Sequence, residues 1–100
     1  LMLTGDPIDA REALAIGLVN HVLPAAEGMT RALQLAERIA QNGPLAVRRL
    51  KQTVTEASGR SLAEGFALED ETKRIVLGSE DAREGPRAFM EKRAPHYRGR

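Results

Sequence analysis

Five basic side chains lie close to the C-terminus of this sequence, namely Arg87, Lys92, Arg93, Arg98 and Arg100. Guanidinium and ammonium groups bind phosphate and carboxylate anions, so an anion contact is plausible here. Arg87 precedes Lys92 by five positions and points in a different direction on a helix. One phosphate is therefore met more naturally by Lys92 with Arg93, or by the tail arginines. The alternative is a solvated helix end, because cations also favour that position.

Acidic residues form two groups, Glu69 to Glu71 and the set Glu80, Asp81 and Glu84. Paired carboxylates can act as general acid and base. Helix surfaces and the first turns of helices often carry the same pattern, because negative charge is favoured near a helix N-terminus. We therefore interpret both groups as solvated helix faces.

His21 and His96 are far apart and have no metal-ligand spacing, so we interpret both as ordinary core or surface histidines. Ser58, Ser61 and Ser79 fall at predicted turns or caps with no histidine base near them in sequence. The sequence therefore predicts no catalytic residue and no metal ligand in this chain.

Composition limits the class of protein. One hundred residues with 42% hydrophobic content are enough for one compact domain or part of a larger one. The 15 basic and 14 acidic residues nearly cancel and aromatics supply 3%, which argues against nucleic-acid binding. No apolar run is long enough for a membrane span, and the absence of cysteine fits the cytoplasm. The start at Leu1, instead of methionine, leads us to expect a piece of a longer chain.

The first part of the chain predicts a turn, a short helix and a strand. Asp9 is the expected N-cap of a helix over 10–16, and Gly17 is the expected left-handed residue that ends it. The following residues, 18–24, are rich in β-branched side chains and end at a proline, which predicts one short strand.

Three longer helices are expected next. Apolar residues at three- and four-residue spacing predict helices over 26–41 and 44–58. Ser61 and Glu64 form a capping box that begins a third helix, which extends to about residue 77. Its apolar side covers about half of the circumference, so this helix needs two neighbours, of which one is a missing domain or a second subunit.

The last helix is expected to begin after Ser79 as its N-cap. Because proline removes a backbone donor and crowds the preceding turn, Gly85 and Pro86 predict two short helical pieces, the second ending near Lys92. The tail after Pro95 is expected to be extended.

Three motifs then occur in a recognisable order: "LTGDPIDAREALAIGLVNHVLP" over 3–24, "IAQNGPLAV" over 39–47, and "SEDAREGPRAFMEKRAPHY" over 79–97. Together they resemble the C-terminal part of the enoyl-CoA hydratase/isomerase, or crotonase, family. The resemblance implies a mainly α fold, the helical C-terminal region of a crotonase-like α/β fold, with about five helices and one short strand. Residues 1–24 would end the crotonase core, and 25–100 would form a helical trimerisation region.

This resemblance implies an acyl-CoA lyase that adds water to 2-enoyl-CoA thioesters, the CoA thioester being the substrate and no separate cofactor being needed. The family's two catalytic glutamates and its oxyanion hole would lie outside this chain, so the 100 residues alone should be inactive. The expected partners are an acyl-CoA and two or five further copies, in a homotrimer or hexamer. Enoyl-CoA isomerase, carnitinyl-CoA-type dehydratase and a catalytically silent oligomerisation module remain alternatives.

The resemblance implies one ligand-binding role for a residue of this chain. In hydratases that the sequence resembles, the lysine of the terminal "EKR" contacts the phosphates of CoA, often those of a neighbouring subunit's ligand. The matching residue is Lys92. The aromatic residue that covers the adenine in the same hydratases is matched by Lys73, so no adenine stacking is expected from that position.

Overall fold

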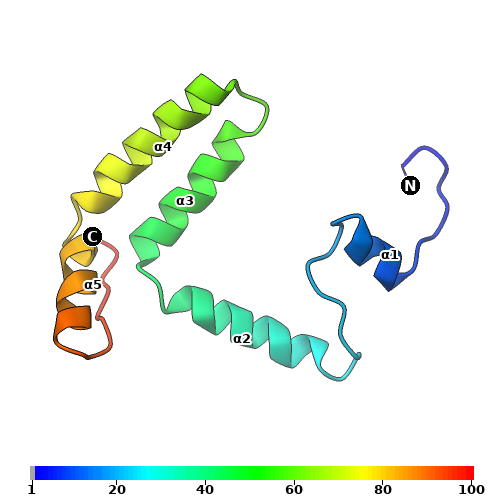
Figure 1. Ribbon diagram of the computed structural model, residues 1–100, viewed down its shortest axis with the longest axis horizontal. Coiled ribbons are helices and arrows are strands. Elements are labelled where there is room, and N and C mark those ends of the chain that lie inside the picture. Colours follow the sequence, from blue (N-terminus) through cyan, green and yellow to red (C-terminus); the bar gives the residue numbers. More distant parts are fainter. Residues whose placement is uncertain (1) are drawn as a thin grey trace. The chain divides into compact units, whose positions relative to one another are not determined.

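The computed structural model describes residues 2–100, which form five helices and no strand (Figure 1). The chain divides into two compact units, Leu1–Leu35 and Ala36–Arg100. Helix α2, Gly28–Ala40, begins in the first unit and ends in the second. The predicted helix over 26–41 is thereby confirmed.

Helix α1, Ala10–Ala15, has the two ends that were predicted for it. The Asp9 carboxylate accepts the backbone N–H of Glu12 at 2.8 Å, and the Glu12 carboxylate accepts the N–H of Asp9 at 3.2 Å. Gly17 has a φ of 74°, the left-handed conformation that glycine adopts without strain. Leu18 N–H then bonds back to the carbonyl of Ala13 at 2.8 Å, which completes a Schellman motif.

The strand that we predicted over 18–24 is wrong for this chain, since residues 2–100 contain no strand. A strand forms only where its backbone groups pair with those of a second strand. The described part of the chain offers no such partner strand, so the β-branched residues after Gly17 form no sheet, and the N–H of Val19 bonds to the carbonyl of Ala13 instead, at 3.3 Å. Residue propensity alone therefore did not decide the conformation of this segment.

Helices α3, Pro44–Ala57, and α4, Leu62–Leu77, lie side by side as an antiparallel hairpin (Figure 1). Both were predicted, and so was the capping box of Ser61, whose N–H donates to the carboxylate of Glu64 at 2.9 Å. Between the helices the hydroxyl groups of Thr53 and Thr72 are hydrogen-bonded. One of the two neighbours expected for α4 is therefore α3.

Helix α5 runs without interruption from Glu80 to Met90, so the predicted break at Pro86 is wrong. Proline disfavours the helical conformation of the preceding residue partly through a clash with its Cβ, and Gly85 has no Cβ. The space beside Gly85 is occupied by Tyr97, whose hydroxyl oxygen would lie 3.1 Å from an added Cβ. The tail thus packs against α5 just before Pro86, and the helix is continuous there although Pro86 supplies no backbone N–H.

The buried apolar side chains of the described residues are both small, Ala13 and Ala88. Large apolar side chains are exposed instead, among them Phe66 at 56%, Phe89 at 85% and Met90 at 82%. Exposed apolar side chains of this size are typical of surfaces on which another part of a protein packs. Within residues 2–100, no helix has both the length and the apolar character that crossing a bilayer requires.

The contact between Gly85 and Tyr97 can be tested with two substitutions. Alanine is favoured over glycine inside a helix by about 1 kcal/mol, but here its methyl group meets the tyrosine hydroxyl. We therefore expect Gly85→Ala to be more favourable in a Tyr97→Phe background than in the wild type, by roughly 1 kcal/mol in the free energy of unfolding. Denaturant titration of the four proteins measures this difference. Equal effects of Gly85→Ala in the two backgrounds would contradict the packing described.

Candidate ligand-binding site

The C-terminal tail folds back along α5 and is held there by backbone hydrogen bonds. The buried carboxylate of Asp81 accepts the N–H groups of Arg98 and Gly99, each at 2.7 Å. The carbonyl of Arg100 in turn accepts the N–H groups of Glu80 and Asp81, at 2.8 and 3.4 Å. These are donors that the first turn of a helix leaves unpaired. The tail therefore completes the N-terminus of α5, and α5 fixes the tail.

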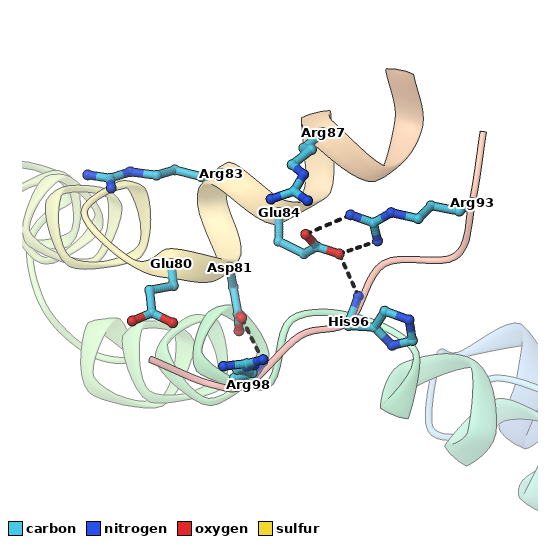
Figure 2. A pocket seen from close by; sticks show the side chains of 8 residues that line it. All are labelled: Glu80, Asp81, Arg83, Glu84, Arg87, Arg93, His96 and Arg98. Atoms are coloured by element: carbon cyan, nitrogen blue, oxygen red, sulfur yellow. Dashed lines mark hydrogen bonds and ion pairs between the residues drawn. The ribbon is translucent and has the colours of Figure 1, made fainter. Parts of the chain in front are cut away.

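A second carboxylate, that of Glu84, holds the start of the tail (Figure 2). Arg93 binds it with two guanidinium nitrogens, Nη1 to Oε1 and Nη2 to Oε2, the latter at 3.0 Å, and the N–H of His96 donates to it at 2.8 Å. The Arg93 guanidinium and then the His96 N–H lower the pKa of Glu84 from its ordinary 4.5 to about 2. Arg93 also binds Glu91 at 2.6 Å. Glu84 therefore stays ionised and paired at neutral pH.

Lys92 occupies an unusual position at the end of α5. Its φ is 53°, and it is the one non-glycine residue with positive φ in the described part of the chain. Lys92 N–H donates to the carbonyl of Phe89 at 3.2 Å, and Arg93 N–H donates to that of Ala88 at 3.1 Å. These two bonds define a Schellman motif in which the left-handed position normally belongs to glycine. In α1 the same position is held by Gly17.

The structure separates the predicted basic residues into paired and unpaired ones. Arg87 binds Glu91 at 3.0 Å, and Arg100 binds Glu80 at 3.1 Å. Arg93 is engaged by two carboxylates, so Lys92 and Arg93 do not form a pair of free donors. Among residues 2–100, the side chains of Lys92 and Arg98 are exposed and have no hydrogen bond or ion pair with the chain.

A polar hollow of about 450 Å³ lies between α5 and the tail (Figure 2). Arg83, which the sequence did not single out, extends from α5 at its edge (Figure 2). Lys92 does not line this hollow. The carboxylates that line it are hydrogen-bonded or ion-paired to residues of the tail. The hollow is lined by Glu80, Asp81, Arg83, Glu84, Arg87, Arg93, His96 and Arg98.

The interpretation of this acidic group as a solvated face is wrong for Asp81 and Glu84, whereas Glu80 is exposed as expected. Asp81 is buried with two backbone donors, and both Glu80 and Glu84 are paired with arginines. The partners lie 9 to 20 residues further along the chain. No local sequence pattern predicts contacts between residues so far apart in the chain. The other acidic group, from Glu69 to Glu71, is exposed on α4 as expected.

Both histidines are exposed, so neither belongs to a core. His21 borders an apolar hollow of the first unit, and His96 uses its backbone, not its ring, to bind Glu84. Over residues 2–100, no group of three or more histidine, aspartate or glutamate side chains is placed to hold a metal ion.

Comparison with known proteins decides the family. A family model described as "Enoyl-CoA hydratase/isomerase" matches residues 1–100. The chain belongs to the enoyl-CoA hydratase/isomerase family. It is 44% identical over 100 residues to enoyl-CoA hydratase EchA19 of Mycobacterium tuberculosis, covering 100% of this chain and 38% of that protein. It is 43% identical over 104 residues to carnitinyl-CoA dehydratase of Proteus mirabilis, covering 100% and 40%.

Solved structures of this enoyl-CoA hydratase/isomerase family confirm the fold class. The crystal structure of enoyl-CoA hydratase from Bacillus anthracis superposes with a TM-score of 0.95 at 39% identity, over 100% of this chain and 39% of that one. A protein from Mycobacterium abscessus, described as a putative enoyl-CoA hydratase/isomerase, gives 0.94 at 45% identity, over 98% and 40%. The chain thus spans about two fifths of the length of these relatives.

The pairing of Glu84 with Arg93 predicts an acid-sensitive stability. Because the folded state lowers the pKa of Glu84 from 4.5 to about 2, its stabilisation is complete above pH 4.5 and is lost as the pH falls towards 2. Glu84→Gln should therefore have a lower Tm than the wild type at pH 7, and the two values should converge between pH 4.5 and 2. Thermal unfolding followed by circular dichroism measures the difference.

Glu69→Gln is a matched control for this measurement, because it removes an exposed carboxylate of α4. We expect its Tm difference from the wild type to be small and to change little over the same pH range. A Tm difference for Glu84→Gln that stays constant from pH 7 to 2 would contradict the role given to the Glu84 carboxylate.

Proposed function

We propose that this chain is the C-terminal part of an enoyl-CoA hydratase, which adds water across the double bond of a 2-enoyl-CoA thioester. The observation that carries the proposal is the match of the whole chain to the family, together with relatives that are named as hydratases. The catalytic groups would come from a preceding segment. The CoA thioester would be the substrate, with no further cofactor, in the cytoplasm and in fatty acid β-oxidation.

A second candidate is dehydration of a carnitinyl-CoA-type substrate. A relative with that name, from Proteus mirabilis, is 43% identical to this chain. Hydration and dehydration are the two directions of one reaction, so both need a general acid and base beside the thioester. Isomerase activity, and a silent oligomerisation module without activity, are the further alternatives.

The intact protein tests these candidates directly. We expect it to hydrate crotonyl-CoA, which is followed by the loss of absorbance of the conjugated thioester. Carnitinyl-CoA and a 3-enoyl-CoA, offered separately, distinguish the dehydratase and the isomerase. A protein that converts none of the three and retains no CoA ester would contradict the proposal and favour the silent module.

Lys92 is the proposed contact of this chain with CoA. Its side chain is exposed and it has no ion pair within residues 2–100, whereas the neighbouring Arg93 is bound by two carboxylates. An ammonium group of this kind can bind a nucleotide phosphate as a point charge. The carboxylates that occupy Arg87, Arg93 and Arg100 leave these residues less free for that role.

Lys92→Gly separates ligand binding from stability. Glycine adopts positive φ without strain, so the substitution should stabilise the intact protein by about 1 kcal/mol. It removes the ammonium group, so KM for a 2-enoyl-CoA should rise roughly threefold at low salt with kcat nearly unchanged. Steady-state kinetics and denaturant titration measure the two effects. A Lys92→Gly protein with an unchanged KM at low salt would refute the contact.

A homotrimer, or a hexamer made of two trimers, is the proposed assembly, with residues 25–100 as the trimerisation region. Support comes from large apolar side chains that remain exposed on α4 and α5, including Leu62, Phe66 and Phe89. Subunit interfaces bury surfaces of this type. Light scattering of the intact protein should give three or six times the mass of the monomer.

A further inference from the structure

The conformation of Lys92 is unfavourable for a lysine and needs support from its neighbours. Left-handed backbone brings Cβ close to the following carbonyl oxygen, which is why the position usually holds glycine. This chain uses glycine for the same motif at Gly17 but lysine at 92. A strained residue at such a place persists only when the surrounding structure holds it.

The two residues that flank Lys92 are tied to each other and to α5. Glu91 binds Arg93 at 2.6 Å, so a carboxylate and a guanidinium close a bridge across Lys92. The same guanidinium is bound at both of its terminal nitrogens by Glu84, nine residues earlier in the chain. The Glu84 side chain is only 17% exposed and that of Arg93 30%. This pair is therefore better shielded from water than the other ion pairs of α5.

Bidentate geometry makes this arrangement directional. Two parallel bonds between guanidinium and carboxylate fix the plane and the distance of both groups. Since Arg93 also donates the N–H that closes the Schellman motif on the carbonyl of Ala88, its backbone and its side chain are both anchored to α5. The residue before it then has little freedom to leave the left-handed conformation.

We infer that Glu84, acting through Arg93, is a positioning residue that holds Lys92 in its left-handed conformation and so aims its ammonium group at the anionic ligand. The identity of that ligand, the phosphates of CoA, rests on the proposed function. A lysine that is already held in place loses less conformational freedom when it binds, and its contact with the ligand is correspondingly tighter. Glu84 itself does not touch the ligand.

Amide hydrogen exchange of the intact protein without ligand tests the holding role. The N–H groups of Lys92 and Arg93 close the Schellman motif, and we expect both to exchange roughly tenfold faster in Glu84→Gln. Adding Lys92→Gly to Glu84→Gln should restore slow exchange, because glycine keeps the turn without support. Glu80→Gln is the matched control. It breaks an ion pair of α5 with Arg100, far along the tail from Lys92, and should leave both amides unchanged.

Unchanged exchange of Lys92 and Arg93 in Glu84→Gln would overturn the inference. A second result would also overturn it: fast exchange in Glu84→Gln that stays fast after Lys92→Gly is added. In that case Glu84 would support something other than the left-handed conformation of Lys92.

Steady-state kinetics test the consequence for the ligand. Glu84→Gln should raise KM for crotonyl-CoA roughly twofold with kcat unchanged, and should have no further effect in a Lys92→Ala background. Equal increases of KM in both backgrounds would overturn the positioning role, since Glu84 would act without Lys92. If Lys92→Ala alone leaves KM unchanged while the exchange pattern is as expected, the CoA contact is refuted and the holding of Lys92 stands.

Discussion

The attachment of the C-terminal tail to α5 through Asp81 and Glu84 is the interaction on which the candidate site depends. A buried carboxylate is costly unless hydrogen bonds compensate it. Asp81 meets this condition by accepting two backbone N–H groups of the tail, and the tail carbonyl of Arg100 satisfies donors at the start of α5. The helix α5 thus supplies hydrogen-bond partners for polar groups of the tail, and the tail supplies partners for polar groups of α5. Loss of either would leave buried donors or acceptors without partners.

The tail also packs against the middle of α5, beside Pro86. A proline in the interior of a helix costs about 3 kcal/mol and often ends it. Here Gly85 removes part of the clash before Pro86, and Tyr97 of the tail fills the space that a side chain would take. The helix therefore continues to Met90 and ends in the motif that contains Lys92. Tail, proline and terminal lysine form one connected structure.

The chain belongs to the enoyl-CoA hydratase/isomerase family and exposes many large apolar residues. The chain spans 38% to 40% of the length of the relatives compared. The described residues bury few large side chains, so much of their apolar surface is available for contacts with other protein. In the proposed enzyme this region would contribute to ligand recognition and to assembly, and the reaction would take place on other residues.

Features decided within three or four residues could be predicted from the sequence by itself. The N-cap Asp9, the capping box of Ser61, the left-handed Gly17 and the existence of helices α3 and α4 are of this kind, because their hydrogen bonds join near neighbours. Only the tertiary structure decided that Asp81 is buried and bound to backbone 17 and 18 residues away. It also decided that α5 continues through Pro86 and that residues 18–24 form no strand. Those outcomes depend on partners distant in the sequence, and residue spacing does not show which distant groups meet.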